Sequence, residues 1–90
     1  MMFYFPQTIE EAVERLMKEL SNDDLDKIKN MKEEDLIMLH FGLGQGIRNS
    51  YGLWADNKAL LKSCGGEDMQ PDDASSAIIN FLWITLRQEK

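Results

Sequence analysis

Hydrophobic residues recur every three or four positions along much of the chain, a spacing typical of amphipathic helices. The clearest such stretch runs from Ile9 to Leu20, with Glu and Lys residues on its other side. Thr8 and Glu11 have the spacing of a capping box, in which a hydroxyl and a carboxylate satisfy free backbone N–H groups at a helix start. We therefore predict a helix over residues 9–20.

A second, shorter helix is predicted by the same reasoning. Ser21 and Asp24 repeat the capping box, and Leu25 and Ile28 continue the apolar spacing. Acidic residues gather at the start of this helix and lysines towards its end, which matches the direction of the helix dipole. The acidic side chains in this part of the chain thus have a local structural explanation.

The third helical pattern, from Leu36 to Tyr51, is apolar on nearly every side, as expected of a buried central helix. It contains three glycines, and glycine inside a helix costs about 1 kcal/mol relative to alanine. Gly42 and Gly46 are four residues apart and share one face of this helix. We expect the backbone of the first or the last helix to pack closely against that face.

The second half of the chain predicts two more helices, separated by turns that contain glycine. Gly52 ends the third helix, and Asp56 is placed to cap a short helix over residues 57–63. Residues 65–70 form a loop, after which Pro71 occupies the first position of the last helix. The inward stripe of this helix consists of Ala74, Ala77, Ile78, Phe81, Leu82 and Leu86.

Two apolar features leave an alternative open. Ile79 and Trp83 widen the stripe of the last helix, which is then either largely buried or partly covered by another subunit. Residues 1–7 are an apolar lead-in that either folds back onto the core or contacts a partner. With either alternative, residues 1–90 form one all-α domain of about five helices, two of them short, around the glycine-containing helix at 36–51.

Composition narrows the class of protein. The 90 residues hold 16 acidic and 10 basic side chains, a net charge of −6, so a surface for nucleic-acid phosphates is not expected. A single cysteine cannot form an internal disulfide and favours the reducing cytoplasm. The apolar runs are shorter than the roughly 20 residues that span a bilayer, and the N-terminus lacks the features of a signal peptide. We expect a cytoplasmic protein that binds neither nucleic acid nor membranes.

No residue pattern identifies an enzyme, a metal site or a cofactor. Gly42, Gly44 and Gly46 resemble part of a phosphate-binding loop, but Ile47 replaces the last glycine of a dinucleotide fingerprint and no strand pattern surrounds it. A chain with one histidine and one cysteine lacks the ligand spacings of zinc sites. We therefore expect no metal and no cofactor, and the residues favour a non-enzymatic protein.

Two polar residues each allow two interpretations, and two more are expected to have structural roles. His40 lies on an apolar face, either as a buried neutral imidazole bonded to a carbonyl or carboxylate, or as an acid–base or ligand group. Cys64 is either a small packing residue or the nucleophile of a dyad with His40. Asn57 and Ser75 are expected at helix caps or turns, which short polar side chains favour.

Arg48 and Asn49 form the most informative polar pair, because they lie in a largely apolar stretch. In the structural interpretation, the guanidinium ties loops together by binding a carbonyl or an acidic group. The candidate acidic partners are Asp56, Asp72 and Asp73. In the functional interpretation, the pair recognises a carboxylate or phosphate beside Tyr51 and Trp54, although Trp54 and Trp83 are both expected in the core. The candidate ligand-binding residues are His40, Arg48, Asn49, Tyr51, Trp54 and Asn57.

Several short strings of residues are similar to those of a known family. They are HFGLG at 40–44 and IRNSYGLW at 47–54, followed by Asn57, Cys64 and PDDAS at 71–75. With these strings the chain, from about Thr8 to Leu86, resembles a family of small uncharacterised prokaryotic proteins catalogued as a domain of unknown function. The resemblance implies a stand-alone helical domain and carries no established activity.

Three functions remain open from the sequence. The leading hypothesis is a non-enzymatic protein-interaction or regulatory module, whose partner is another protein or a second copy of the chain in a homodimer. The second is an acidic inhibitor of the immunity-protein type, which binds a basic partner. The third is a small-molecule-binding domain centred on His40, Arg48, Asn49 and Trp54.

Overall fold

A computed structural model of the protein describes residues 5–55 and 57–88. Within these ranges the α-helices are α1 (Ile9–Glu19), α2 (Asn22–Lys29), α3 (Gln45–Ser50), α4 (Lys58–Cys64) and α5 (Pro71–Gln88). A 3₁₀ segment, η1 (Glu33–Leu39), and a π-helical turn, η2 (His40–Gly44), lead directly into α3. The described ranges contain no strand, and the predicted all-α fold of five helices is confirmed.

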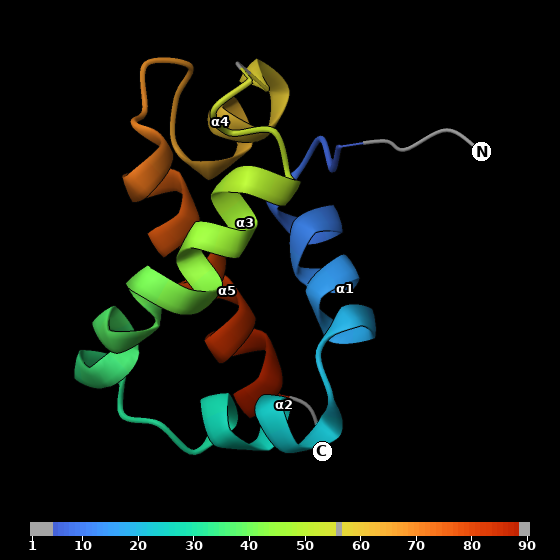
Figure 1. The fold of residues 1–90 in the computed structure, drawn as a ribbon, viewed down its shortest axis with the longest axis vertical. Helices are drawn as coiled ribbons and strands as arrows, with labels where there is room; N and C mark the ends of the chain where they lie inside the picture. The colour runs from blue at the N-terminus through green and yellow to red at the C-terminus, as the bar shows by residue number, and fades with distance from the viewer. Residues whose placement is uncertain (1–4, 56, 89–90) are drawn as a thin grey trace.

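The last helix, α5, is the element around which the others are arranged (Figure 1). Helices α1 to α4 and the η1 and η2 segments all contact α5. Figure 1 shows α5 passing behind α3, with α2 near one end of the bundle and α4 near the other. The glycine-containing stretch at 36–51 therefore forms one wall of the bundle rather than its centre.

The first two helices begin as the sequence predicts. The Thr8 hydroxyl accepts a hydrogen bond from the Glu11 N–H (3.1 Å), and the Ser21 hydroxyl accepts one from the Asp24 N–H (3.1 Å). The Glu11 carboxylate in turn accepts a hydrogen bond from the N–H of Gln7 (3.3 Å). These contacts satisfy backbone donors that have no partner inside a helix, which explains why both helices begin at these positions.

The two C-terminal helices also begin close to the predicted positions. The Asn57 side chain accepts a hydrogen bond from the Leu60 N–H, which makes Asn57 the N-cap of α4 and confirms its expected capping role. Asp56, the predicted cap, lies outside the described residues. Residues 65–70 connect α4 to α5, and Pro71 is the first residue of α5, as predicted.

Gly52 ends the third helix in the manner that the sequence predicts. Its φ is +75°, a left-handed conformation that favours glycine, and the Leu53 N–H donates to the Arg48 carbonyl (3.2 Å) in a Schellman-type closure. The Phe5 ring lies against Gly52, and Pro6 is buried. The described part of the N-terminal lead-in thus folds back onto the domain, whereas residues 1–4 lie outside the described ranges.

The expected close packing at Gly42 and Gly46 is wrong. Both glycines are exposed, and a Cβ added at either position would have nothing within 4 Å. The close approach is at Gly44, where a Cβ would lie 3.1 Å from Arg48 Nη1 and 3.7 Å from the Ile79 side chain of α5. The face that carries Gly42 and Gly46 points to solvent instead.

Alanine substitutions at two glycines should therefore have opposite effects on the free energy of unfolding. Gly46→Ala should raise it by about 0.5–1 kcal/mol, because an exposed helical glycine has no packing role to lose. Gly52→Ala should lower it by about 1–2 kcal/mol through the left-handed backbone alone, and its Cβ would also displace Phe5. Urea unfolding followed by tryptophan fluorescence measures both changes. A destabilised Gly46→Ala variant would contradict the exposed position of this face.

The expectation that the 36–51 stretch is buried on all sides is also wrong. Leu36 and Ile47 are buried, but Ile37 is 76% exposed, Met38 72% and Phe41 81%. The physical reason is that α5 covers one side of this stretch and the described residues supply no further element to cover its outer side. We call Ile37, Met38 and Phe41 the exposed apolar face.

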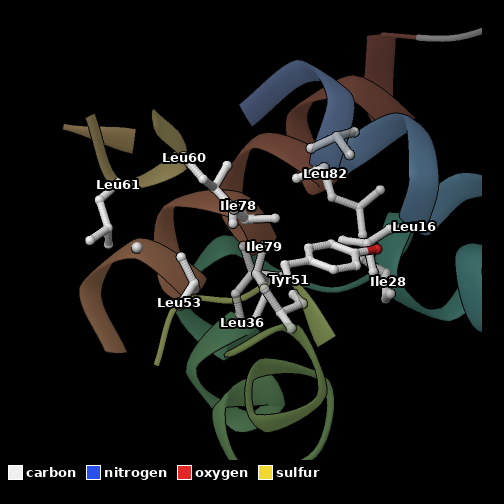
Figure 2. Packing of buried hydrophobic residues seen from close by; sticks show 14 of the residues in the cluster. Leu16, Ile28, Leu36, Tyr51, Leu53, Leu60, Leu61, Ile78, Ile79 and Leu82 are labelled. Carbon is white, nitrogen blue, oxygen red and sulfur yellow. The ribbon is translucent and has the colours of Figure 1, made fainter. Parts of the chain in front are cut away.

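The core lies between α5 and the helices around it (Figure 2). Its α5 side chains are Ala74, Ile78, Ile79, Leu82 and Leu86, all buried. Leu16 of α1 and Tyr51, which follows α3, point toward one another in Figure 2, and Leu36 lies close to Ile79. None of the helices in the described ranges combines the length and apolarity needed to cross a membrane.

Candidate functional site

The Arg48 side chain is buried, and each of its three guanidinium nitrogens has a partner within the fold. Its Nη1 donates to Ser75 Oγ (3.0 Å), its Nη2 donates to the His40 carbonyl (3.3 Å), and its Nε lies 3.3 Å from Asp72 Oδ1. Ser75 Oγ donates in turn to the Asp72 carbonyl (2.9 Å), so Ser75 lies within the first turns of α5 and is not its cap. Of the two candidate partners that the structure describes, Asp72 pairs with Arg48 and Asp73 does not, while Asp56 lies outside the described residues. Arg48 thereby ties α3 to η2 and to the start of α5.

Asn49 and Trp54 do not share the surroundings of Arg48. Asn49 is exposed, because neighbouring residues on a helix point about 100° apart. Trp54 is 62% exposed, so its predicted core position is wrong: Leu53 turns into the core after Gly52 and the next side chain points outward. Trp83 is partly buried, packs against the core and donates its Nε1–H to the Met31 carbonyl (2.9 Å).

Tyr51 and Asn57 hold the scaffold together at the end of α3. The Tyr51 side chain is buried, and its hydroxyl donates to Glu19 Oε1 (3.0 Å). Burial, followed by the hydrogen bond and the charge of Glu19, raises the pKa of Tyr51, so the phenol stays neutral at ordinary pH. The Asn57 amide donates to the carbonyls of Pro6 (2.9 Å) and Tyr51 (2.9 Å).

Cys64 and His40 lie in different surroundings. Burial, with a smaller contribution from the charge of Glu10, raises the pKa of the Cys64 thiol to about 11, so the thiol is protonated at neutral pH. His40 lines a groove to which Cys64 does not contribute. The expected buried, hydrogen-bonded imidazole is wrong: the ring is partly exposed, makes no hydrogen bond with the described residues and meets Phe41 edge to face (5.4 Å).

The groove beside His40 runs between the η1–η2 wall and α5, with a volume of about 460 Å³. Its apolar lining comes from both walls and consists of Leu36, Ile37, Ala77 and Ile79. Glu33 and Asp73 supply carboxylates at its rim, and neither has an ion-pair partner among the described residues. We call this space the acidic groove. Ile37 belongs both to it and to the exposed apolar face, so the two form one continuous surface.

A second groove of about 460 Å³ lies between α1 and α5. Val13, Met17 and Phe81 supply its apolar lining. On its rim, Lys18 Nζ lies 3.6 Å from Glu14 Oε1, so part of the charge there is already balanced. Glu10 also lines this second groove and has no ion-pair partner among the described residues. The adjoining exposed apolar face therefore distinguishes the acidic groove as the better candidate site.

The structure does not gather the six candidate ligand-binding residues into one site. His40 lines the acidic groove, Tyr51 lies in the core, and Arg48 and Asn57 bond within the scaffold. Asn49 and Trp54 point to solvent. No group of three His, Cys, Asp or Glu side chains in the described ranges could hold a metal ion. Sequence reasoning missed Glu33 and Asp73, because each also has an ordinary role in the first turn of a helical segment.

A comparison with protein families gives one result. The model of a domain of unknown function (DUF6794) matches residues 5–86, nearly the whole chain. Neither the curated proteins nor the solved structures contain a match to the chain. The expected membership in an uncharacterised family is confirmed, and the match assigns no activity.

Proposed function

We propose a function from the surface of the molecule itself, because the chain belongs to the family described as a domain of unknown function (DUF6794). The domain is a non-enzymatic protein-interaction module. Its binding surface is the exposed apolar face together with the acidic groove. The single half-buried free cysteine fits a reducing compartment such as the cytoplasm.

The observation that carries this proposal is the exposure of three large apolar side chains on one segment. Ile37, Met38 and Phe41 are all more than two-thirds exposed, and the acidic groove adjoins them. Contiguous exposed apolar side chains with a polar rim are characteristic of protein-interaction sites. Removing such side chains from water stabilises a complex by about 25 cal/mol for each Å² of apolar surface buried.

The roles of the remaining candidate residues also favour a protein-interaction module over a small-molecule site. Arg48 and Asn57, two of the six ligand-binding candidates from the sequence, direct their hydrogen bonds to groups of the protein. Cys64 lacks the low pKa of a reactive thiol. Arg48 and Asn57 therefore serve the scaffold and Cys64 is unreactive, whereas His40 alone of these polar groups lines the acidic groove.

The acidic inhibitor remains the second candidate, and a specific observation favours it. The unpaired carboxylates of Glu33 and Asp73 border the acidic groove, and the whole chain carries a net charge of −6. Both features suit a partner with basic side chains. Binding to such a partner should weaken as the salt concentration rises, since salt screens exposed charges.

Substitution of Phe41 tests the proposed binding surface. The wild type, Phe41→Ser and Trp54→Ser would each serve as immobilised bait in lysate of the source cells. Phe41→Ser should lose the captured partner, whereas Trp54→Ser, which removes an exposed aromatic outside the proposed surface, should retain it. Both variants should keep the free energy of unfolding within about 0.5 kcal/mol of the wild type. Equal capture by all three baits would contradict the proposal.

A further inference from the structure

We infer that the ligand of the acidic groove is an amphipathic helix of a partner protein, with a basic residue at each end of its apolar stripe. This inference rests on the proposed function and deepens it by naming the chemistry of the bound segment. It follows from the placement of the groove's carboxylates, the apolar surface between them and the lack of an ion pair at either carboxylate among the described residues.

The two walls of the groove run in opposite directions. At one end, Trp83 near the end of α5 donates to the carbonyl of Met31, which lies just before η1 (2.9 Å). At the other end, Arg48 in α3 donates to Ser75 near the start of α5 (3.0 Å). The η1–η2–α3 segment therefore runs antiparallel to α5: η1 lies beside the C-terminal part of α5, and α3 lies beside its N-terminal part.

This antiparallel arrangement puts the two rim carboxylates at opposite ends of the groove. Glu33 begins the η1 wall and lies towards Asn80, whereas His40, later in that wall, lies towards Asp73. Asn80 follows Asp73 by seven positions in α5, which is about 10 Å of helix length. Glu33 and Asp73 are thus offset along the groove by about two turns of α5, roughly 10 Å along the helix axis, with apolar surface between them.

A helix matches this offset more closely than an extended strand does. In a helix, residues i and i+7 lie on one face about 10 Å apart, and residues i+3 and i+4 lie between them on the same face. In a strand, side chains on one face recur at about 6.6 and 13 Å, and both distances lie farther from this offset. The ligand therefore carries Lys or Arg at i and i+7 and apolar residues at i+3 and i+4.

Charge also argues against a second copy of the chain as the ligand. The chain has a net charge of −6, so two copies repel one another. No two of its Lys and Arg residues are seven positions apart, so no helix of the chain itself offers the required pair. Neither Glu33 nor Asp73 is neutralised by an ion pair within the described ranges, which leaves both carboxylates for the partner's cations.

A designed helical peptide tests the inference directly. It would carry Lys at i and i+7 and Leu at i+3 and i+4, and a matched peptide would carry Glu in place of both lysines. Titrations of the ¹⁵N-labelled domain should give saturable shifts in both groove walls with the Lys peptide. Its affinity should exceed that of the Glu peptide by about tenfold or more, and it should fall as salt is added.

Variants of the domain refine the test. Glu33→Gln and Asp73→Asn should each weaken binding of the Lys peptide by about two- to fivefold, the range expected for one exposed ion pair. Glu34→Gln removes a neighbouring exposed carboxylate that does not line the groove, and it should leave the affinity unchanged.

The inference is overturned if the Lys peptide produces no saturable shifts in the groove walls, or if the Glu peptide binds equally well. A loss on Glu34→Gln equal to that on Glu33→Gln would also overturn it. The proposed function is tested separately, by comparing the capture of the cellular partner by the wild-type and Phe41→Ser baits. Suppose that the Phe41→Ser bait loses the cellular partner while the Lys and Glu peptides bind with equal affinity. The proposed protein-interaction function is then supported, and the inference of a basic helical ligand is overturned.

Discussion

Replacing Arg48 with alanine should lower the free energy of unfolding by about 3 kcal/mol. The guanidinium is 7% exposed and joins Ser75, the His40 carbonyl and Asp72, so its removal leaves buried polar atoms without a donor and a space beside them. The effect should lie near the lower limit for breaking a buried ion pair, because the Asp72 carboxylate is more than half exposed and remains hydrated.

Two further variants make this prediction specific. Asp72→Asn should cost less than about 1 kcal/mol, since the charge of an exposed partner contributes little. Arg48→Lys should be intermediate, because an ammonium cannot reproduce the fork of donors that serves three acceptors. Urea unfolding followed by tryptophan fluorescence reports all three changes. If Arg48→Ala were as stable as the wild type, the arginine would have no role in the scaffold, and ligand screening should begin at that residue.

The second large effect is expected in α5. Leu82→Ala should lower the free energy of unfolding by about 3 kcal/mol, because Leu82 is fully buried in the helix that every other helix contacts. Ile84→Ala is the matched control, since it truncates an exposed aliphatic side chain two positions away in the same helix. Its effect should stay below about 1 kcal/mol. Similar losses in the two variants would contradict the assignment of α5 as the centre of the core.

The parts of the fold that depend on local chemistry were predictable from the sequence. Thr8, Ser21 and Asn57 cap helices through hydrogen bonds to residues three positions later, and Gly52 ends a helix through its own backbone conformation. Pro71 begins α5 because its missing N–H is not needed there. These signals can be read from neighbouring residues in the sequence, without knowing which helices pack together.

The parts that depend on tertiary packing were not predictable. The sequence makes Ile37 and Phe41 look like core residues, since periodicity cannot tell an apolar side that meets α5 from one that meets water. Trp54 is exposed for a similar reason, because the turn after Gly52 decides which of two adjacent apolar residues enters the core. The many apolar residues of the 36–51 stretch therefore indicate an exposed apolar surface as well as a buried core face.

The candidate site was predictable only in part. The anchoring role of Arg48 was one of two interpretations that the sequence left open, and Asp72, whose Oδ1 lies 3.3 Å from Arg48 Nε, was one of three candidate acidic partners. The acidic groove was not anticipated, because Glu33 and Asp73 are forty residues apart in sequence and meet one groove only through the antiparallel contact of η1–η2 with α5. The molecule thus separates into a polar anchor that holds the scaffold and an apolar, acidic surface that faces outward.

Oxidative footprinting in lysate of the source cells tests the central claim, that the exposed apolar face binds a partner. Met38 and Phe41 report on this face, and Trp54 is an internal control of comparable exposure outside it. Compared with buffer alone, lysate should reduce the modification of Met38 and Phe41 and leave that of Trp54 unchanged. Equal modification of all three residues in lysate and buffer, or protection of Trp54 alone, would contradict the claim.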